Sequence, residues 1–340
     1  MPIKKPFKKT EPTPTKKLAP KKKAAVKRSA VVAAPSSEYT EDYDAECPAE
    51  PMYSLWDHDY EDEPSLIGVG GGHKGYIVRW YVNASQKWNR SVVVGGLPCL
   101  YGVWGATEEP LLIAVGSGII LCSETGGETW QKCSYQESET LFRVGFTGTL
   151  EKLWAVGERG VVVCSTDRGS SWQRVKIPIT VNLISVYAVD DLVLIGASSG
   201  EFCVSADAGK SWRVVASGVA LAINRIWGTA AWLSAVTNQG YVLNSIDQGA
   251  SWSALKLQKT SSHFEGGCLV NGDLYAVGTD TSIYYKPKKE AWTQIKLGVS
   301  SWDVFPASGS AYVSTQEGTV YQLLGSRAIE LKDREGFVTA

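Results

Sequence analysis

The stretch Ser165-Thr166-Asp167-Arg168-Gly169-Ser170-Ser171-Trp172 recurs along this chain with the same design. Three further octets begin at Ser123, Ser205 and Ser245, and each of them ends in a tryptophan. Tryptophans continue this series on both sides, with spacings of 42, 42, 40, 40 and 40 residues, at Trp88, Trp130, Trp172, Trp212, Trp252 and Trp292. A period near 40 residues indicates that one structural unit is repeated.

The octet has the chemistry of a tight β-hairpin. Its Ser and Asp side chains can hydrogen-bond the turn backbone, its Gly can take a positive φ, and we expect its Trp to wedge between neighbouring sheets. The pattern Ser-x-Asp-x-Gly-x-Ser-Trp resembles the Asp-box, or BNR repeat, of sialidases and of many non-enzymatic propellers. Three copies match it fully, whereas the copy at Ser123 has Thr125 in place of Asp. The predicted structural residues are Ser123, Gly127, Trp130, Ser165, Asp167, Gly169, Trp172, Ser205, Asp207, Gly209, Trp212, Ser245, Asp247, Gly249 and Trp252.

Counting the repeats predicts an all-β fold, a seven-bladed β-propeller of four-stranded antiparallel blades. Each unit combines an inner strand, a second strand, a Gly turn, a third strand, the octet turn and a fourth strand. The predicted limits are 51–96, 97–138, 139–179, 180–218, 219–258, 259–297 and 298–333. Six blades are the alternative, because the last unit lacks both the octet and its Trp.

Composition favours a soluble globular chain without a cofactor. Hydrophobic residues make up 44% of 340 residues, and no apolar run approaches the roughly 20 residues that span a membrane. The N-terminus carries charge with no apolar segment behind it, which predicts an intracellular protein rather than a secreted one. Seven scattered cysteines, never spaced as Cys-x-x-Cys, suggest neither a disulfide framework nor a metal site.

The N-terminal region is predicted to be a disordered basic arm. Residues 1–37 hold eleven Lys and Arg against one Glu, with few large apolar residues. We predict domains at 1–37 (arm), 38–50 (acidic linker), 51–334 (propeller) and 335–340 (tail). The arm's candidate contact residues are Lys16, Lys17, Lys21, Lys22, Lys23, Lys27 and Arg28.

This arm has several interpretations. It could bind nucleic acid or another anionic surface, serve as a nuclear address if the organism is a eukaryote, or act as a tail in particle assembly. It could equally be a solvated tail that folds back on the acidic residues after it.

Two columns of the aligned inner strands bear on binding. The first is Ser54, Gly102, Arg143, Ser185, Arg225, Gly267 and Asp303. We hypothesise that Arg143, Arg225 and Asp303 form a polar rim at one mouth of the channel, suited to an acidic peptide or carboxylate; the alternative is local pairing with acids. The second column, which we expect to pack between blades, is Trp56, Trp104, Tyr187, Trp227 and Phe305.

The predicted function is that of a non-enzymatic scaffold for protein interaction or assembly. Sialidases carry an arginine triad, which cannot be matched to residues of this chain, and a Tyr-Glu pair. Glu201, Glu265 and Glu317 are available carboxylates, but no pair at a defined separation can be assigned among them. The repeats also resemble seven-bladed Asp-box propellers that assemble photosystem II in the thylakoid lumen, which implies a protein partner bound on one face. The alternatives are a carbohydrate-binding or glycosidase-like propeller and a nucleic-acid-associated or virion-type structural component. The partner, the binding face and the oligomeric state stay open.

Overall fold

The computed structural model describes residues 52–57, 65–71, 74–82, 88–106, 109–146, 152–257, 263–288, 290–307 and 309–331. The predicted basic arm, the acidic linker and the C-terminal tail lie outside these residues, and so do the candidate arm contacts.

The described residues form seven four-stranded antiparallel sheets, which we call blades 1 to 7 in chain order. The strands of blades 1 to 3 are β1 (Met52–Asp57), β2 (Ser65–Gly71), β3 (Gly75–Val82), β4 (Trp88–Leu97); β5 (Leu100–Gly105), β6 (Leu112–Gly116), β7 (Ile119–Ser123), β8 (Gln131–Lys132); and β9 (Leu141–Phe146), β10 (Leu153–Gly157), β11 (Val162–Ser165), β12 (Gln173–Arg174). Those of blades 4 and 5 are β13 (Leu183–Val189), β14 (Leu192–Ala197), β15 (Glu201–Ser205), β16 (Arg213–Ala216); and β17 (Ile223–Thr229), β18 (Trp232–Thr237), β19 (Tyr241–Ser245), β20 (Ser253–Lys256). Those of blades 6 and 7 are β21 (Phe264–Val270), β22 (Asp273–Gly278), β23 (Ser282–Lys286), β24 (Thr293–Lys296); and β25 (Ser301–Ala307), β26 (Ser310–Thr315), β27 (Val320–Leu324), β28 (Arg327–Glu330). Short 3₁₀ turns η1 (Glu158–Gly160) and η2 (Asn238–Gly240) join the second and third strands of blades 3 and 5.

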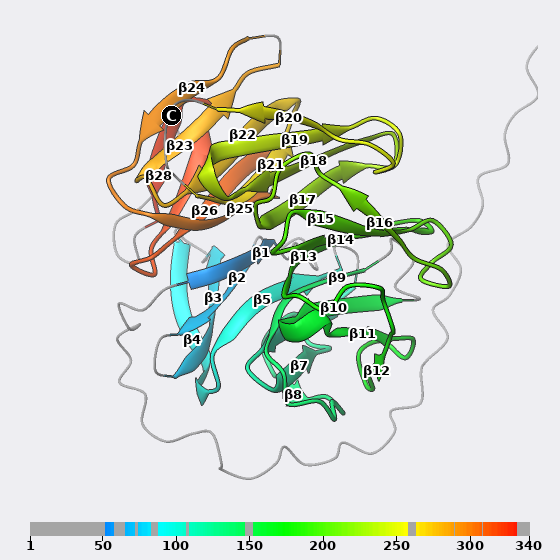
Figure 1. The fold of residues 1–340 in the computed structure, drawn as a ribbon. Helices are drawn as coiled ribbons and strands as arrows, with labels where there is room; N and C mark the ends of the chain where they lie inside the picture. Colours follow the sequence, from blue (N-terminus) through cyan, green and yellow to red (C-terminus); the bar gives the residue numbers. More distant parts are fainter. Residues whose placement is uncertain are drawn as a thin grey trace, which may run out of the picture. The chain divides into compact units, whose positions relative to one another are not determined.

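The chain is a seven-bladed β-propeller. Figure 1 shows the blades following one another around the molecule, from blue β1 to the orange and red strands of blade 7. The first strand of each blade lies against the first strand of the next, and β1 also lies against β25, so that the ring is closed. The six-blade alternative is therefore wrong, because β25 to β28 pair into a complete sheet although their repeat lacks an octet.

The hydrophobic core lies between the blades. Seven clusters of buried side chains are found among the described residues, and each cluster joins two adjacent blades. The second strands explain this arrangement, since β2, β6, β10 and β14 are buried along their whole length. Short runs of Leu, Ile, Val and Ala are typical of strands that are covered on both faces.

Blades 7 and 1 are held together by side chains rather than by an exchanged strand. Met52, Trp80 and Tyr76 of blade 1 share one buried cluster with Phe305 and Tyr312 of blade 7. In addition, the Ser54 hydroxyl donates a hydrogen bond of 3.1 Å to the Asp303 carboxylate. Closure therefore depends on apolar burial and on buried polar contacts such as the bond between Ser54 and Asp303.

The octets form the hairpins between the third and fourth strands of blades 2 to 5. In blade 3, the Asp167 carboxylate accepts hydrogen bonds from the Ser165 hydroxyl (2.8 Å) and the Ser171 amide (2.9 Å). The Ser165 hydroxyl in turn accepts the Gly169 amide at 2.9 Å. The octets of blades 4 and 5 repeat this network around Asp207 and Asp247.

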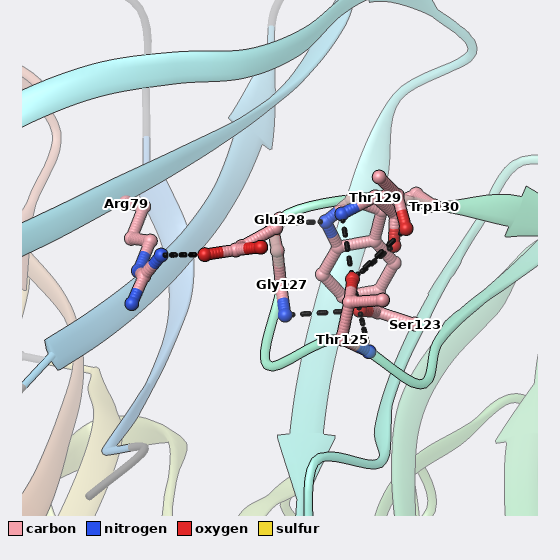
Figure 2. Close-up of polar contacts among 7 residues, drawn as sticks. All are labelled: Arg79, Ser123, Thr125, Gly127, Glu128, Thr129 and Trp130. Carbon is pink, nitrogen blue, oxygen red and sulfur yellow. Dashed lines mark hydrogen bonds and ion pairs between the residues drawn. The ribbon is translucent and has the colours of Figure 1, made fainter. Parts of the chain in front are cut away.

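Blade 2 keeps the same hairpin without the carboxylate, as Figure 2 shows. The Thr125 hydroxyl accepts the Thr129 amide at 2.8 Å, and the Ser123 hydroxyl accepts the Gly127 amide at 2.9 Å. The Trp130 indole donates to the Gly127 carbonyl at 3.0 Å. A neutral hydroxyl thus occupies the position of the carboxylate.

Each octet glycine packs against the second strand of the preceding blade. A Cβ on Gly209, whose φ is +85°, would lie 2.2 Å from Trp154 Cη2 of β10. Equivalent clashes would meet side chains of β2, β6 and β14 at Gly127, Gly169 and Gly249. The glycine is therefore required both for its backbone conformation and for the approach of two blades.

Candidate binding site at the channel mouth

Each inner strand carries a β-bulge near its start. The ladder with the second strand skips one residue in every blade, between Met52 and Ser54 in blade 1 and between Phe264 and Gly266 in blade 6, for example. The seven extra residues, which we call the bulge ring, are Tyr53, Tyr101, Phe142, Ile184, Asn224, Glu265 and Trp302. A bulge re-aims one side chain out of the sheet, and here it does so seven times around one end of the channel.

The bulge ring lines a hollow of about 280 Å³ together with Arg143. Four of its members are aromatic and come from consecutive blades. Tyr53 lies between Trp302, at 5.3 Å between ring centroids, and Tyr101, at 5.2 Å. Tyr101 contacts Phe142 in an edge-on arrangement at 5.9 Å. These four rings form an aromatic crescent on blades 7, 1, 2 and 3, whereas Asn224 and Glu265 lie on blades 5 and 6.

One residue further along each strand lies an inner tier, which contains the residues hypothesised as a polar rim. Its members are Ser54, Gly102, Arg143, Ser185, Arg225, Gly266 and Asp303. The sequence alignment placed Gly267 in this column, and the register corrects it to Gly266, because Gly266 pairs with Val277 directly after the bulge. A Cβ on Gly266 would lie 2.7 Å from the Val304 backbone nitrogen, so adjacent inner strands approach closely there.

Within the inner tier, Asp303 is fully buried and has several partners. Its carboxylate accepts bonds from Ser54 (3.1 Å) and from the Val304 amide (3.0 Å). Arg225 Nη1 approaches Asp303 Oδ2 at 3.7 Å, and the Arg225 side chain is 20% exposed. Arg225 and Asp303 are thus engaged with each other. Arg143 instead donates from Nη1 to the Tyr101 carbonyl at 2.7 Å.

Two polar atoms at this mouth have no hydrogen-bond partner among the described residues. Arg143 Nε and Trp302 Nε1 are buried nitrogens without a hydrogen-bond acceptor. Burial lowers the pKa of Arg143, and the neighbouring charge of Asp303 opposes that shift. Burial also raises the pKa of Glu265, against the attraction of Arg143. Unsatisfied groups in a hollow cost free energy that a ligand can recover.

The side chain of Asn224 holds the backbone next to Glu265 in place. Asn224 Nδ2 donates to the Phe264 carbonyl at 2.6 Å and to Asn238 Oδ1 at 2.8 Å. The bond to Phe264 ties the bulge of β21 to β17 of the preceding blade. Sequence reasoning noted Glu265 only as one carboxylate among several, and the one-residue shift of the blade 6 alignment hid its place in the ring. The signal for the correct register was the apolar Phe264, which precedes Glu265 and pairs with Gly278.

The channel has a second hollow of about 450 Å³ beyond the inner tier. Trp104, Tyr187 and Trp227 of the predicted aromatic column line it, and Arg225 reaches it from the tier. Phe305 of the same column is 1% exposed in the cluster between blades 7 and 1. The side chain of Trp56 lies outside the described residues.

The octets lie away from the bulge ring. Because successive strands alternate in direction, hairpins between third and fourth strands fall on the opposite face from the starts of the inner strands. Hydrogen bonds from Ser211 and Ser251 hold the pKa values of Asp207 and Asp247 at about 2. At Asp167, burial opposes the shift, and the Ser171 bonds outweigh it and lower the pKa. These carboxylates therefore stabilise the turns in which they lie.

The cysteines that the structure places are free thiols, at Cys99, Cys122, Cys133, Cys164, Cys203 and Cys268. Over the described ranges, no three His, Cys, Asp or Glu side chains gather as metal ligands would. Within that same part of the chain, no helix is long and apolar enough to cross a membrane.

Comparison with known proteins gives a likeness of fold. No family model matches the chain, and no curated protein matches its sequence. Among solved structures, "YCF48 bound to D1 peptide" is similar with a TM-score of 0.63 and 13% identity, covering 82% of this chain and 93% of that one. The "WD40 beta propeller domain of Doa1" is similar with a TM-score of 0.65 and 13% identity, covering 81% of this chain and 93% of that one.

Proposed function

We propose that this protein is a non-enzymatic scaffold that binds a protein partner at the bulge-ring mouth. The observation that carries the proposal is that residues shared by the repeats and residues that differ between them have different surroundings in the protein. Residues that recur in the repeats engage one another, as in the octet networks and the clusters between blades. Residues that differ between repeats gather at the mouth, where Arg143 Nε and Trp302 Nε1 lack partners among the described residues.

The structural neighbours support this proposal by analogy of fold. One of them, YCF48, is a propeller with a bound D1 peptide, and the other is a WD40 propeller domain. A closed ring of blades is a rigid support, and a site on a rigid support loses little conformational entropy on binding. Of the hypothesised rim, we assign Arg143 to contact with the partner, and we assign Arg225 and Asp303 to positioning the inner tier.

The test is partner capture from the native source by the tagged full-length protein. The mouth variants are Trp302→Ala and Arg143→Ala. Leu255→Ala and Val214→Ala are controls, because these exposed residues lie on outer strands. The proposal predicts a protein that is retained by the wild type and the controls and lost with both mouth variants. Capture that is indifferent to the mouth variants would refute it.

We propose that the basic arm is a second, separate contact, for nucleic acid or another anionic surface. Its support is the sequence alone, with eleven positive charges in residues 1–37. Such binding weakens steeply with salt because counterions are released on association. Deleting residues 1–37 should abolish retention on nucleic acid at low salt, and unchanged retention would refute this role.

A further inference from the structure

We propose that the mouth accepts an uncharged, extended, proline-containing segment of the partner. This inference rests on the proposed function and specifies the chemistry of its ligand. Three properties of the bulge ring point to it: the aromatic crescent, the unpartnered buried donors and the balance of charge.

The aromatic crescent supplies the surface. Trp302, Tyr53, Tyr101 and Phe142 are partly buried, and their neighbouring centroids are 5.2 to 5.9 Å apart. Adjacent rings on the inner strands of successive blades create the ridged, apolar floor on which the rings of a polyproline II segment pack. Such a segment is already extended in solution, so that it loses little entropy when it binds.

The unpartnered groups specify the main-chain chemistry. Trp302 Nε1 and Arg143 Nε are donors without acceptors among the described residues. A proline segment suits two donors, since each of its residues offers a carbonyl oxygen and none offers an N–H group. Glu265 also lines the hollow and accepts the N–H of a residue that flanks the prolines.

The charges around the hollow favour an uncharged ligand. Arg143 and Glu265 both line the hollow, and Arg225 pairs with Asp303 in the inner tier, so each basic side chain at this mouth has an acidic side chain close by. A lysine or an aspartate entering this desolvated site would leave one charge without compensation, which is costly. An uncharged segment preserves the balance.

Short capped peptides test the inference by titration calorimetry on the full-length protein. The probe is acetyl-(Pro)6-amide, and acetyl-(Gly-Ser)3-amide is the flexible control of equal length. We expect saturable binding of the proline probe alone. Replacing its fourth proline with Lys or with Asp should weaken binding several-fold. A charged probe that binds about tenfold tighter than the proline probe would overturn the assignment.

Variants locate the binding. Trp302→Ala should weaken the proline probe by about tenfold or more, as expected for a central aromatic contact. Trp302→Phe keeps an aromatic ring and removes the N–H, so a loss of about fivefold in affinity for the proline probe is expected. Tyr81→Phe on β3, away from the mouth, is the matched control and should change nothing. Equal binding by the wild type and Trp302→Ala would overturn the inference.

Two further outcomes separate this inference from the proposed function. If Trp302→Ala abolishes partner capture but the proline probe does not bind, only the ligand chemistry is refuted. If the probe binds only after residues 1–37 are deleted, the protein's own prolines occupy the mouth, and the assignment to a partner segment is overturned.

Discussion

Replacing Gly209 with Ala tests how the octet hairpins join the blades. The new Cβ would lie 2.2 Å from Trp154 Cη2, and the φ of +85° is strained for any residue with a Cβ. The backbone strain costs about 1–2 kcal/mol. Trp154 is only 1% exposed and cannot move away, so that overpacking adds about 1–3 kcal/mol.

Gly218→Ala is the matched control for this substitution. Gly218 has a φ of +87°, but a Cβ there meets no atom within 4 Å. The control therefore bears the backbone strain alone, and the difference between the variants reports the contact between blades. We expect Gly209→Ala to be less stable than Gly218→Ala by about 2 kcal/mol, which is roughly 4–8 °C in the thermal midpoint.

A second substitution identifies the contact. The Trp154 atoms nearest to the added Cβ are Cη2, Cζ2 and Cζ3, which phenylalanine lacks, and Trp154 Nε1 has no partner among the described residues to lose. In the background of Gly209→Ala, Trp154→Phe should therefore recover stability, with a coupling of about 1 kcal/mol or more in a double-mutant cycle. Circular dichroism melting of the full-length variants measures each term. Equal midpoints for Gly209→Ala and Gly218→Ala, or zero coupling, would refute the reasoning.

Three further predictions concern the hairpins and the closure of the ring. Asp207 and Asp247 have folded pKa values of about 2, below the unfolded value of about 3.9, so they stabilise the fold above pH 4 and lose this effect as the pH falls toward 2. The variant Asp207→Asn/Asp247→Asn should show a shallower fall of the thermal midpoint over that window, and an unchanged slope would contradict the prediction. Thr125→Asp should stabilise blade 2 by about 1 kcal/mol in urea titration, because an ionised acceptor forms stronger hydrogen bonds than a hydroxyl; a lower midpoint would count against it. Asp303→Ala should cost about 3–5 kcal/mol, since it leaves Arg225 without its buried partner, whereas Ser54→Ala should cost about 1 kcal/mol. Equal losses in these two variants would show that the ion pair is not what Asp303 contributes.

The blades could be predicted from the sequence because the octets, with their turn chemistry, recur at a nearly fixed spacing. The octet glycine at Gly209 meets the preceding blade, and Asp207 accepts bonds within its own turn. The glycine recurs in all four octets and the Asp in three of them, so their period can be read directly. Blade 7 could be counted without an octet because its inner and second strands keep the apolar pattern.

The mouth could be predicted only in part, for the opposite reason. Its residues are those in which the repeats differ, and a period says nothing about them. Arg143, Arg225 and Asp303 were singled out by alignment, but the pairing of Arg225 with Asp303 depends on ring geometry. The sequence alignment of blade 6 was shifted by one residue, because Gly266 and Gly267 follow Glu265 and either of them could be aligned with the inner tier. The bulge is a feature of the pairing between an inner strand and the second strand of its blade, so the sequence of one strand alone does not reveal it.

The most direct test of the account is site-specific photocrosslinking in the native source. Ile184, which lines the hollow, and, separately, Tyr81 are replaced with p-benzoylphenylalanine in the full-length protein, which is then irradiated and analysed by mass spectrometry. The account predicts that a distinct protein crosslinks at position 184 and that none crosslinks at position 81. Crosslinking at position 81 alone, or the same products at both positions, would contradict a partner site at the bulge-ring mouth.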